Sequence, residues 1–307
     1  MQSSPRRALE GAFDSVSIVR QLHDVPPHAV YEVVVDGDRA VFKHDVAPTG
    51  SAGVEGRVQA LVHAESSVPV PRVLAVGADH YVAAWHPDAP APDASTTAGP
   101  AWARAAGRGL AALHEDTASV LDGYGAFEAS GEGVRTAGRS SWHDAALAYA
   151  TRHRRAVARY GYGDVIDEAI AYLEAHPEAF ADAGEPVCCH GWATPEHVAV
   201  VDDAVACVVD FEHAIAAPAA FDYWRTAHPT FDGESPASRA FRDGYRSVRE
   251  LPPSLDEREL LYALLNAIYY LESLHVQDHH DRHETARRAR ALTAHVHDLL
   301  DALDRRP

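Results

Sequence analysis

The hydrophobic pattern of the first 86 residues predicts a small lobe that combines helices with strands. Two β-rich runs lie on either side of Asp36-Gly37, a dipeptide typical of hairpin turns. Apolar residues at helical spacing follow shortly afterwards. The expected elements are, in order, a helix over residues 5–15, two strands within residues 29–44, a helix over residues 53–65, and strands over residues 72–76 and 80–85.

Helical periodicity dominates after residue 100. Before it, residues 87–100 are rich in proline and small residues, which is the composition of a linker. A single β interruption is expected between Val187 and Phe211, where a hairpin forms around Asp202-Asp203. The expected elements are helices over residues 101–114, 142–160 and 164–175, hairpin strands over residues 197–201 and 204–209, and three long helices after Pro236.

This order predicts an α+β, bilobal fold. A β-rich N-terminal lobe (residues 1–86) is followed by a hinge (residues 87–100) and by a larger helical lobe (residues 101–307) with a β-hairpin at the cleft. Ligand clefts commonly lie at such junctions. A ligand site is therefore expected between the lobes.

Composition narrows the class of protein. The 307 residues are 47% apolar, as in globular proteins, and their formal net charge of −18 argues against binding along nucleic acid. An acidic chain with a single lysine has a halophilic composition, as in salt-adapted cytoplasmic proteins. No apolar stretch reaches the roughly 18 residues of a membrane span, and no secretory signal is evident. Because three cysteines build no disulfide framework, a cytoplasmic location is expected.

Lys43 is the only lysine in a chain that otherwise uses arginine for positive charge. An ammonium is a compact point charge that suits phosphate oxygens and a carboxylate, whereas a guanidinium is a broad fork. Glu55 lies on the helix face that also carries Val58 and Val62, so it is placed to meet Lys43 across the lobe. The alternative is that Lys43 is an ordinary surface residue.

A second set of polar residues begins at His190-Gly191-Trp192. It continues through Glu196 and His197 and resumes after the hairpin with Asp210-Phe211-Glu212. A carboxylate directly after a buried apolar strand can project into a cleft and hold a hard cation such as Mg²⁺. The alternative for Asp210 is a role in a turn or as a helix cap.

Taken together, these residues resemble the aminoglycoside phosphotransferase and choline-kinase-like family, which has a protein-kinase-like fold. The resemblance also includes the Pro-Val-Pro-Arg-Val-Leu segment at residues 69–74 and Leu113-His114, and it covers roughly residues 10–230. It implies a kinase activity that transfers phosphate from ATP to a hydroxyl group of a small molecule. The implied cofactors are ATP and Mg²⁺, and the acceptor molecule stays unidentified.

The same resemblance implies roles for the matching residues. In the cleft, Lys43 would contact the nucleotide phosphates, Glu55 would orient Lys43, and Asp210 would hold Mg²⁺. His190 would brace the catalytic loop, and Asp222 would tie that loop to the following helix, with a helix N-cap as the alternative for Asp222.

Adenine would lie against the hinge at residues 84–87, which includes Trp85 and His86. The turn over the phosphates is expected at residues 23–28. That turn has two prolines and no glycine, so its backbone offers fewer N–H donors to phosphate.

The catalytic loop also departs from the family pattern. The family reads His-Gly-Asp, four residues and Asn, whereas here Trp192 takes the Asp position and His197 the Asn position. Loss of a general base costs roughly 10²–10⁴-fold in rate, but phosphoryl transfer depends mainly on positioning and charge. Glu196 and Glu212 are the nearest candidates for a surrogate base. His197 is a candidate metal ligand, although imidazole favours Zn over Mg²⁺, and Trp192 offers a face for a planar ligand.

Three functions therefore remain open. The first is an ATP-dependent phosphotransferase with a non-standard base, and the second is a kinase-like pseudoenzyme that binds nucleotide or a small molecule and regulates a partner. The third is a metal-dependent hydrolase that uses His275, His279 and His283, which recur every four residues on one expected helix. A solvated acidic helix face is the ordinary interpretation of those histidines. The joint presence of Lys43, Glu55 and Asp210 favours the first function.

Overall fold

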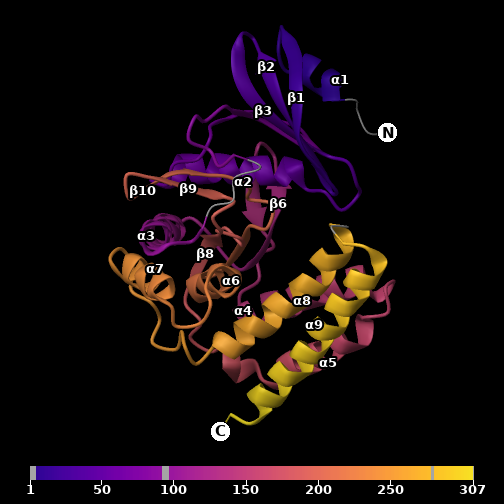
Figure 1. Cartoon of the computed structure of the whole chain (residues 1–307), viewed down its shortest axis with the longest axis vertical. Helices are drawn as coiled ribbons and strands as arrows, with labels where there is room; N and C mark the ends of the chain where they lie inside the picture. Colours follow the sequence, from indigo (N-terminus) through magenta and orange to yellow (C-terminus); the bar gives the residue numbers. More distant parts are fainter. Residues whose placement is uncertain (1–4, 92–96, 278–279, 307) are drawn as a thin grey trace.

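The computed structural model describes residues 5–91, 97–277 and 280–306, and it has a β-rich and a mainly helical part (Figure 1). The N-terminal part is built on a five-stranded antiparallel sheet with the strand order β1-β2-β3-β5-β4. Helix α2 lies beneath this sheet and faces the rest of the molecule (Figure 1). The elements are α1 (Pro5–Glu10), β1 (Val16–Val25), β2 (His28–Val35), β3 (Asp38–Asp45), α2 (Ala52–Glu65), β4 (Val73–Val76) and β5 (His80–Ala84).

The larger part combines helices with a four-stranded sheet, β7-β6-β11-β8, and a separate hairpin of β9 and β10. None of its described helices, nor of those in the N-terminal part, has the length and hydropathy needed to cross a bilayer. The elements are α3 (Pro100–Thr117), β6 (Gly125–Ser130), β7 (Gly133–Thr136), α4 (Trp142–Ala158), α5 (Gly163–Ala175), the 3₁₀ helix η1 (Pro177–Phe180), β8 (Pro186–Cys189), β9 (Val198–Val201), β10 (Ala204–Val208), β11 (Ile215–Pro218), α6 (Ala219–Thr230), α7 (Pro236–Arg246), α8 (Glu259–Val276) and α9 (Arg282–Asp304).

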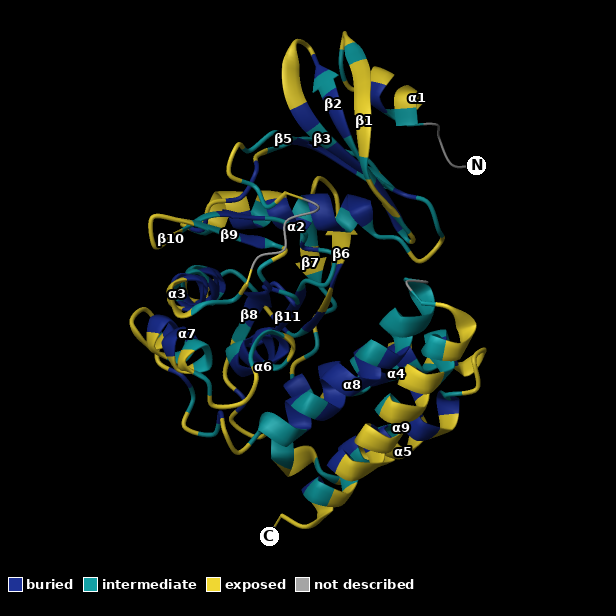
Figure 2. Ribbon diagram, viewed as in Figure 1, coloured by how far each residue is buried: buried dark blue, intermediate teal, exposed yellow. Residues whose placement is uncertain are grey.

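Two packing features position the functional residues. On β3, side chains alternate between the two faces of the sheet, so Phe42 enters the small core of the N-terminal part while Lys43 points the other way. Helix α8 is apolar on most of its circumference and is buried between α4, α6 and α9 (Figure 2). It therefore lies packed within the helical part, below the N-terminal part (Figure 2).

The α+β fold expected from the sequence is confirmed, including the hairpin at residues 198–208 and the three helices after Pro236. The expected helix at residues 5–15 is wrong beyond Glu10, because residues 11–15 form a turn, and strand β1 (Val16–Val25) that follows was not expected. This edge strand is mostly exposed, as Figure 2 shows, and its apolar residues do not alternate with polar ones.

The expectation of a single β interruption in the helical part is also wrong. Strands β6 and β7 form a short hairpin before α4, and β11 joins their sheet to β8. Strand β11 reads Ile-Ala-Ala-Pro and is buried on both faces, so small residues leave no alternating pattern to detect. The expected hinge at residues 87–100 includes residues 92–96, which lie outside the described residues, and Pro100 already begins α3.

Candidate functional site

Lys43 lies at the centre of a cluster of three carboxylates between the two parts of the molecule. Its Nζ is 2.8 Å from Glu55 Oε2, 2.7 Å from Asp210 Oδ1 and 3.1 Å from Glu212 Oε2. Strand β3 and helix α2 supply Lys43 and Glu55, while Asp210 and Glu212 come from the segment after β10. Lys43 is 5% exposed, so the ordinary surface position considered from the sequence is wrong.

The electrostatics of this cluster follow from three acids sharing one ammonium. Burial opposes the charged form of Lys43, yet Asp210, Glu55 and Glu212 hold its pKa well above the usual range. Burial raises the pKa of Glu55 to about 7, although Lys43 opposes the shift. Burial also disfavours ionised Asp210 and Glu212, but Lys43 keeps the pKa of both below their usual range. Around the Lys43 ammonium itself, carboxylates thus outnumber ammonium groups by three to one.

This excess of carboxylate oxygen fits a divalent cation. Mg²⁺ prefers carboxylate, phosphate and water oxygens, and it is usually held by one or two protein carboxylates. The side chain of Asp210 is 29% exposed and so keeps an open side toward the cleft. Asp210, with Glu212 beside it, is therefore the residue that could hold a divalent cation.

Asp210 owes its orientation to an unusual backbone. Its φ is +70°, a left-handed conformation in which non-glycine residues are uncommon. Phe211 follows and is buried against the ring of His190, with ring centroids 4.7 Å apart. This packing turns the neighbouring carboxylates of Asp210 and Glu212 outward, to the same ammonium.

The turn over the cleft joins β1 to β2 through Pro26-Pro27, as the sequence places it, and the bond between the two prolines is cis. The first residue of β2, His28, is buried and reaches across the cleft. Its Nε2 lies 3.2 Å from Glu212 Oε2, and its Nδ1 lies 3.0 Å from Asp45 Oδ1. Burial lowers the pKa of His28, but these two carboxylates raise it to about 9. A positively charged imidazole thus stands where the prolines offer no N–H group.

The loop after β8 is held by Asp222, a fully buried residue of α6. The two carboxylate oxygens accept hydrogen bonds from the backbone N–H groups of His190 (2.7 Å) and Gly191 (2.8 Å). His114 Nε2 lies 3.0 Å from the same carboxylate. The N-cap of α6 is Pro218, so Asp222 anchors the loop and does not cap the helix.

His190 braces this loop as a neutral ring. Its Nε2 donates to the carbonyl of Val209 (2.9 Å), and its Nδ1 accepts from the N–H of Trp192 (3.2 Å). Burial and the neighbouring His197 lower the pKa of His190 to about 4. The ring therefore fixes the loop to the segment that carries Asp210.

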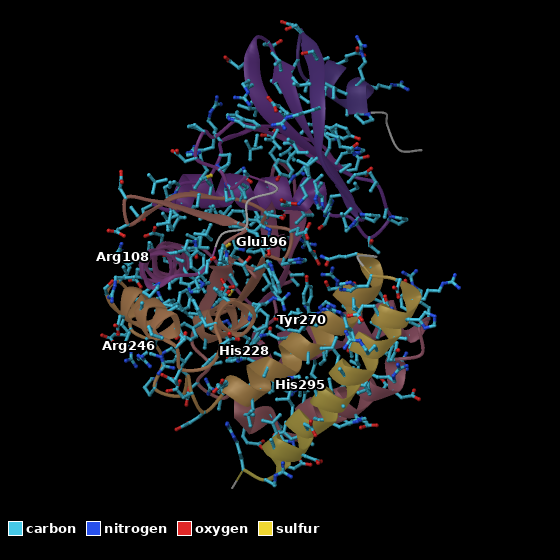
Figure 3. The ribbon with its side chains drawn as sticks, in the orientation of Figure 1. Arg108, Glu196, His228, Arg246, Tyr270 and His295 are labelled. Carbon is cyan, nitrogen blue, oxygen red and sulfur yellow. The ribbon has the colours of Figure 1, made fainter. Side chains whose placement is uncertain are left out.

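Trp192 packs against helix α8. Its ring centroid lies 5.9 Å from that of Tyr269 and 5.8 Å from that of Tyr270, which Figure 3 labels on α8. Arg225 of α6 lies behind the loop and donates from Nε to the carbonyl of Gly191 (2.6 Å). Trp192 therefore fills space beside α8 and presents no acidic group to the cleft.

His197 lies beside Asp210. Its Nε2 is 3.1 Å from Asp210 Oδ2, and its Nδ1 is 3.0 Å from the carbonyl oxygen of Trp192. Burial lowers the pKa of His197, but the Asp210 carboxylate raises it to about 9. Because a protonated imidazole has no free lone pair, this arrangement suits a residue that holds Asp210 better than a metal ligand.

The remaining expected residues lie further from Lys43. Glu196 is exposed in the turn before β9, and Figure 3 shows it below α2. Trp85 follows β5 and packs under the Arg39 guanidinium, whose Cζ is 3.9 Å from the ring centroid. His86 Nδ1 accepts from the N–H of Asp88 (3.3 Å). Glu212, but not Glu196, thus belongs to the carboxylate cluster.

A cavity of about 300 Å³ opens next to this cluster, beneath the turn over the cleft. The cluster contributes Glu212, and α8 contributes Tyr269, whose hydroxyl lies 2.9 Å from His213 Nε2. His213 Nε2 is in turn 3.1 Å from Glu212 Oε1. A small molecule in this cavity would lie against the same carboxylate that contacts Lys43.

A protein-family model described as "Phosphotransferase enzyme family" matches residues 27–261. The chain belongs to the phosphotransferase enzyme family. The match includes Lys43, Glu55, the loop at His190 and the Asp210-Phe211-Glu212 segment. None of the curated proteins is significantly similar to this sequence.

Solved structures share the fold of this phosphotransferase family member at low identity. A candidate fructosamine-3-kinase from Thermobifida fusca has 20% identity and a TM-score of 0.69, with 99% of each chain covered. A thermostable mutant of the aminoglycoside phosphotransferase APH(4)-Ia, in complex with ADP and hygromycin B, has 17% identity and a TM-score of 0.68, with 97% of this chain and 99% of the other covered. The macrolide 2'-phosphotransferase MphH from Brachybacterium faecium has 19% identity, a TM-score of 0.55, and coverage of 94% and 95%.

The histidine-based metal site is not supported by the described part of this phosphotransferase. Helix α8 ends at Val276 and α9 begins at Arg282, so His275 and His283 do not lie on one helix. His275 stacks on Tyr160, with centroids 4.4 Å apart. His279 lies outside the described residues. The periodicity was misleading because a helix boundary interrupts it.

Proposed function

We propose that this member of the phosphotransferase enzyme family transfers the γ-phosphoryl group of ATP to a hydroxyl group of a small molecule. The observation that carries the proposal is the contact of Lys43 with Glu55 and Asp210 beside a cavity. The complex of APH(4)-Ia with ADP and hygromycin B supports a nucleotide and a small-molecule acceptor in this fold. A cytoplasmic location is part of the proposal, because ATP is available there and the three cysteines are free thiols.

In this proposal each residue of the cluster has a defined task. Lys43 binds the phosphate oxygens, and Glu55 holds the ammonium in place when its other partners move toward the ligands. Asp210 holds Mg²⁺, which supplies positive charge to the phosphates when bound. His28 occupies the turn above them and adds a second positive charge. Trp85 and His86 are proposed to receive adenine at the hinge.

The transfer step places the proton on Glu212. The acceptor oxygen forms a bond to the γ-phosphorus, the bond from that phosphorus to the bridging oxygen breaks, and ADP leaves with the electron pair. The proton of the hydroxyl passes to the Glu212 carboxylate, which lines the cavity. Glu196 is the weaker candidate for this role because it lies outside the cluster. A carboxylate with a low pKa is a weak base, which agrees with a loose transition state that needs little proton removal.

The proposal is tested first by nucleotide binding. We expect Mg-ATP to raise the melting temperature of the wild type, since a ligand that binds only the folded state stabilises it. Lys43→Met should abolish the shift, whereas Arg6→Met, which removes an exposed surface pair with Glu10, should retain it. A wild type without a shift over a range of KCl concentrations would end the nucleotide hypothesis.

A kinase-like pseudoenzyme is the second candidate. The observation that favours it is the position of Trp192, which packs against α8 where the family pattern has an acidic residue. Release of ADP in a screen of alcohols, sugars and amino sugars would select the enzyme. Nucleotide binding without ADP release from any acceptor would select the pseudoenzyme.

A further inference from the structure

The cavity beside Glu212 has an unequal balance of charge. Each of its acidic lining residues already has a partner: Glu128 pairs with Arg135 at 2.8 Å, Glu212 pairs with Lys43, and Glu272 contacts Nδ1 of His153, whose pKa is lowered by burial. In contrast, the three arginines that line the cavity have no carboxylate within 4.0 Å in the described part of the chain. They are Arg139, Arg152 and Arg225.

Arg225 is the most informative of these arginines, because it is 2% exposed. Its Nε donates to Gly191 O (2.6 Å) and its Nη1 to Asn266 Oδ1 (3.3 Å), both of which are neutral acceptors. Its Cζ lies 3.8 Å above the ring of Tyr269. No hydrogen bond of Nη2 is present among the described residues, although a guanidinium has five donors. A buried charge without an ionic partner is costly unless a ligand completes it.

The other two arginines surround Arg225 with further positive charge. Arg152 lies on α4 and is exposed. Burial raises the pKa of Glu272, whereas His153 and, to a smaller extent, Arg152 lower it, with a net lowering. Arg139 is half-buried just before α4. A chain with a net charge of −18 repels anions at long range, so a local surplus of arginine requires a specific reason.

We propose that this cavity binds the acceptor through an anionic group, a carboxylate or a phosphate, held by Arg225 with Arg139 and Arg152. Treating the bound anion as the acceptor rests on the proposed function. Arg225 supplies the buried anchor, and the planar ring of Tyr269 holds the guanidinium so that its free edge faces the ligand. The hydroxyl group of the same molecule then lies toward Glu212.

Molecules that differ only in charge test this proposal. One series is glucuronate, glucose and glucosamine, and a second is glycerate, glycerol and 3-amino-1,2-propanediol; glucose 6-phosphate adds the phosphate case. Melting temperature is measured without nucleotide at constant ionic strength, and ADP release is measured with Mg-ATP. We expect at least one anion to stabilise the wild type more than its neutral and cationic counterparts do. Glucuronate against glucose 6-phosphate then separates carboxylate from phosphate.

The arginine variants connect this preference to the cavity. We expect Arg152→Gln or Arg139→Gln to weaken anion binding by about tenfold, the effect of about 1.4 kcal/mol. Arg155→Gln, an exposed arginine of the same helix outside the cavity lining, should have no effect. Arg225→Lys keeps the charge but loses the fork, and should raise KM for an anionic acceptor more than it lowers kcat.

Two outcomes would overturn the assignment: equal or better binding of the neutral or cationic molecules, and no stabilisation by any anion. Anion binding that survives both Arg139→Gln and Arg152→Gln and persists in Arg225→Lys would also place the anion elsewhere. Failure of the phosphotransferase proposal is seen separately, as the absence of a Mg-ATP shift. Anion stabilisation without that shift would retain the cavity and discard the reaction.

Discussion

Lys43 Nζ lies 2.7 Å from Asp210 Oδ1, although 167 residues separate them in the chain. The contact connects strand β3 of the N-terminal part with the segment after β10. Glu55 and Glu212 contact the same ammonium, so the ion cluster joins the N-terminal part to the helical part across the cleft. A ligand that enters this point must replace these contacts with its own.

Removal of the ammonium should leave buried negative charge without a partner. We expect Lys43→Met to lower the free energy of unfolding by about 3–5 kcal/mol, since Glu55 is buried. Glu55→Gln in the Lys43→Met background should restore part of this loss, with a coupling of roughly 1–3 kcal/mol in a double-mutant cycle. Urea unfolding measures both. Arg6→Met is the surface control, at about 0–1 kcal/mol. Strict additivity of the two cleft substitutions would contradict the shared cluster.

The two candidate bases should behave differently. We expect Glu212→Gln to lower kcat by roughly 10²-fold, the lower end of the range for a general base, because a loose transition state needs little proton removal. Glu196→Gln should change kcat by less than about twofold, because Glu196 is exposed and substitutions at exposed positions usually have small effects. Initial rates of ADP release give both values. Full turnover in the Glu212 variant would remove Glu212 from the mechanism.

Asp222 should be a strong determinant of stability. Asp222→Asn keeps the shape of the side chain but removes the charge that accepts from two N–H groups and faces His114. We expect a loss of about 2–4 kcal/mol in urea unfolding, because a buried amide N–H₂ would face backbone donors. Asp232→Asn, at an exposed position, is the matched control. Equal stability of the two variants would show that the loop has another anchor.

Two neutral histidines should make the protein sensitive to mild acid. Burial lowers the pKa of both His190 and His228 to about 4, whereas an unfolded histidine has a pKa of about 6.5. Between these values the unfolded chain binds more protons than the folded chain. The stabilising contribution of these two histidines is therefore complete above pH of about 6.5 and is lost as pH drops toward about 4, by up to roughly 3 kcal/mol per histidine.

The proton linkage is measured by urea unfolding between pH 5 and 7.5. His228→Gln should give a shallower dependence on pH than the wild type, because one linked proton is removed. His63→Gln, at an exposed position of α2, should keep the wild-type slope. A His228 variant with the wild-type slope would assign the acid sensitivity to other groups.

The sequence predicted those parts of the molecule in which the hydrophobic periodicity of a segment matches the way the segment is buried. The pair Lys43 and Glu55 was found because a strand with period two and a helix with period 3.6 each place one side chain on a known face. Asp210 was found because it follows a buried strand. The edge strand β1 was missed because exposure on both faces leaves no pattern, and β11 because burial on both faces has the same effect.

Other functional residues depend on contacts that no local pattern records. His28 follows a turn with two prolines, which lack backbone N–H donors. Nothing in the local sequence indicates that the ring of His28 contacts Glu212. Arg225 is one of 26 arginines, and the lack of an acidic partner for it within residues 5–91, 97–277 and 280–306 becomes visible only in the folded chain. His213 and Tyr269 meet from distant segments in the same way. Such residues can be identified only from a structure, because what marks them is a contact, or a missing contact, with a residue far away in the sequence.

The buried lysine provides a natural reporter. Lys43 carries the only side-chain amine of the sequence, so an amine-directed acylating reagent has one internal target in addition to the α-amino group. Protonation and three acidic neighbours keep that amine unreactive while the two parts are in contact. Mass spectrometry of the intact protein would then count one extra acyl group for each molecule that has separated there. The rate of labelling at Lys43 thus measures how often the two parts of the protein separate, without an engineered probe.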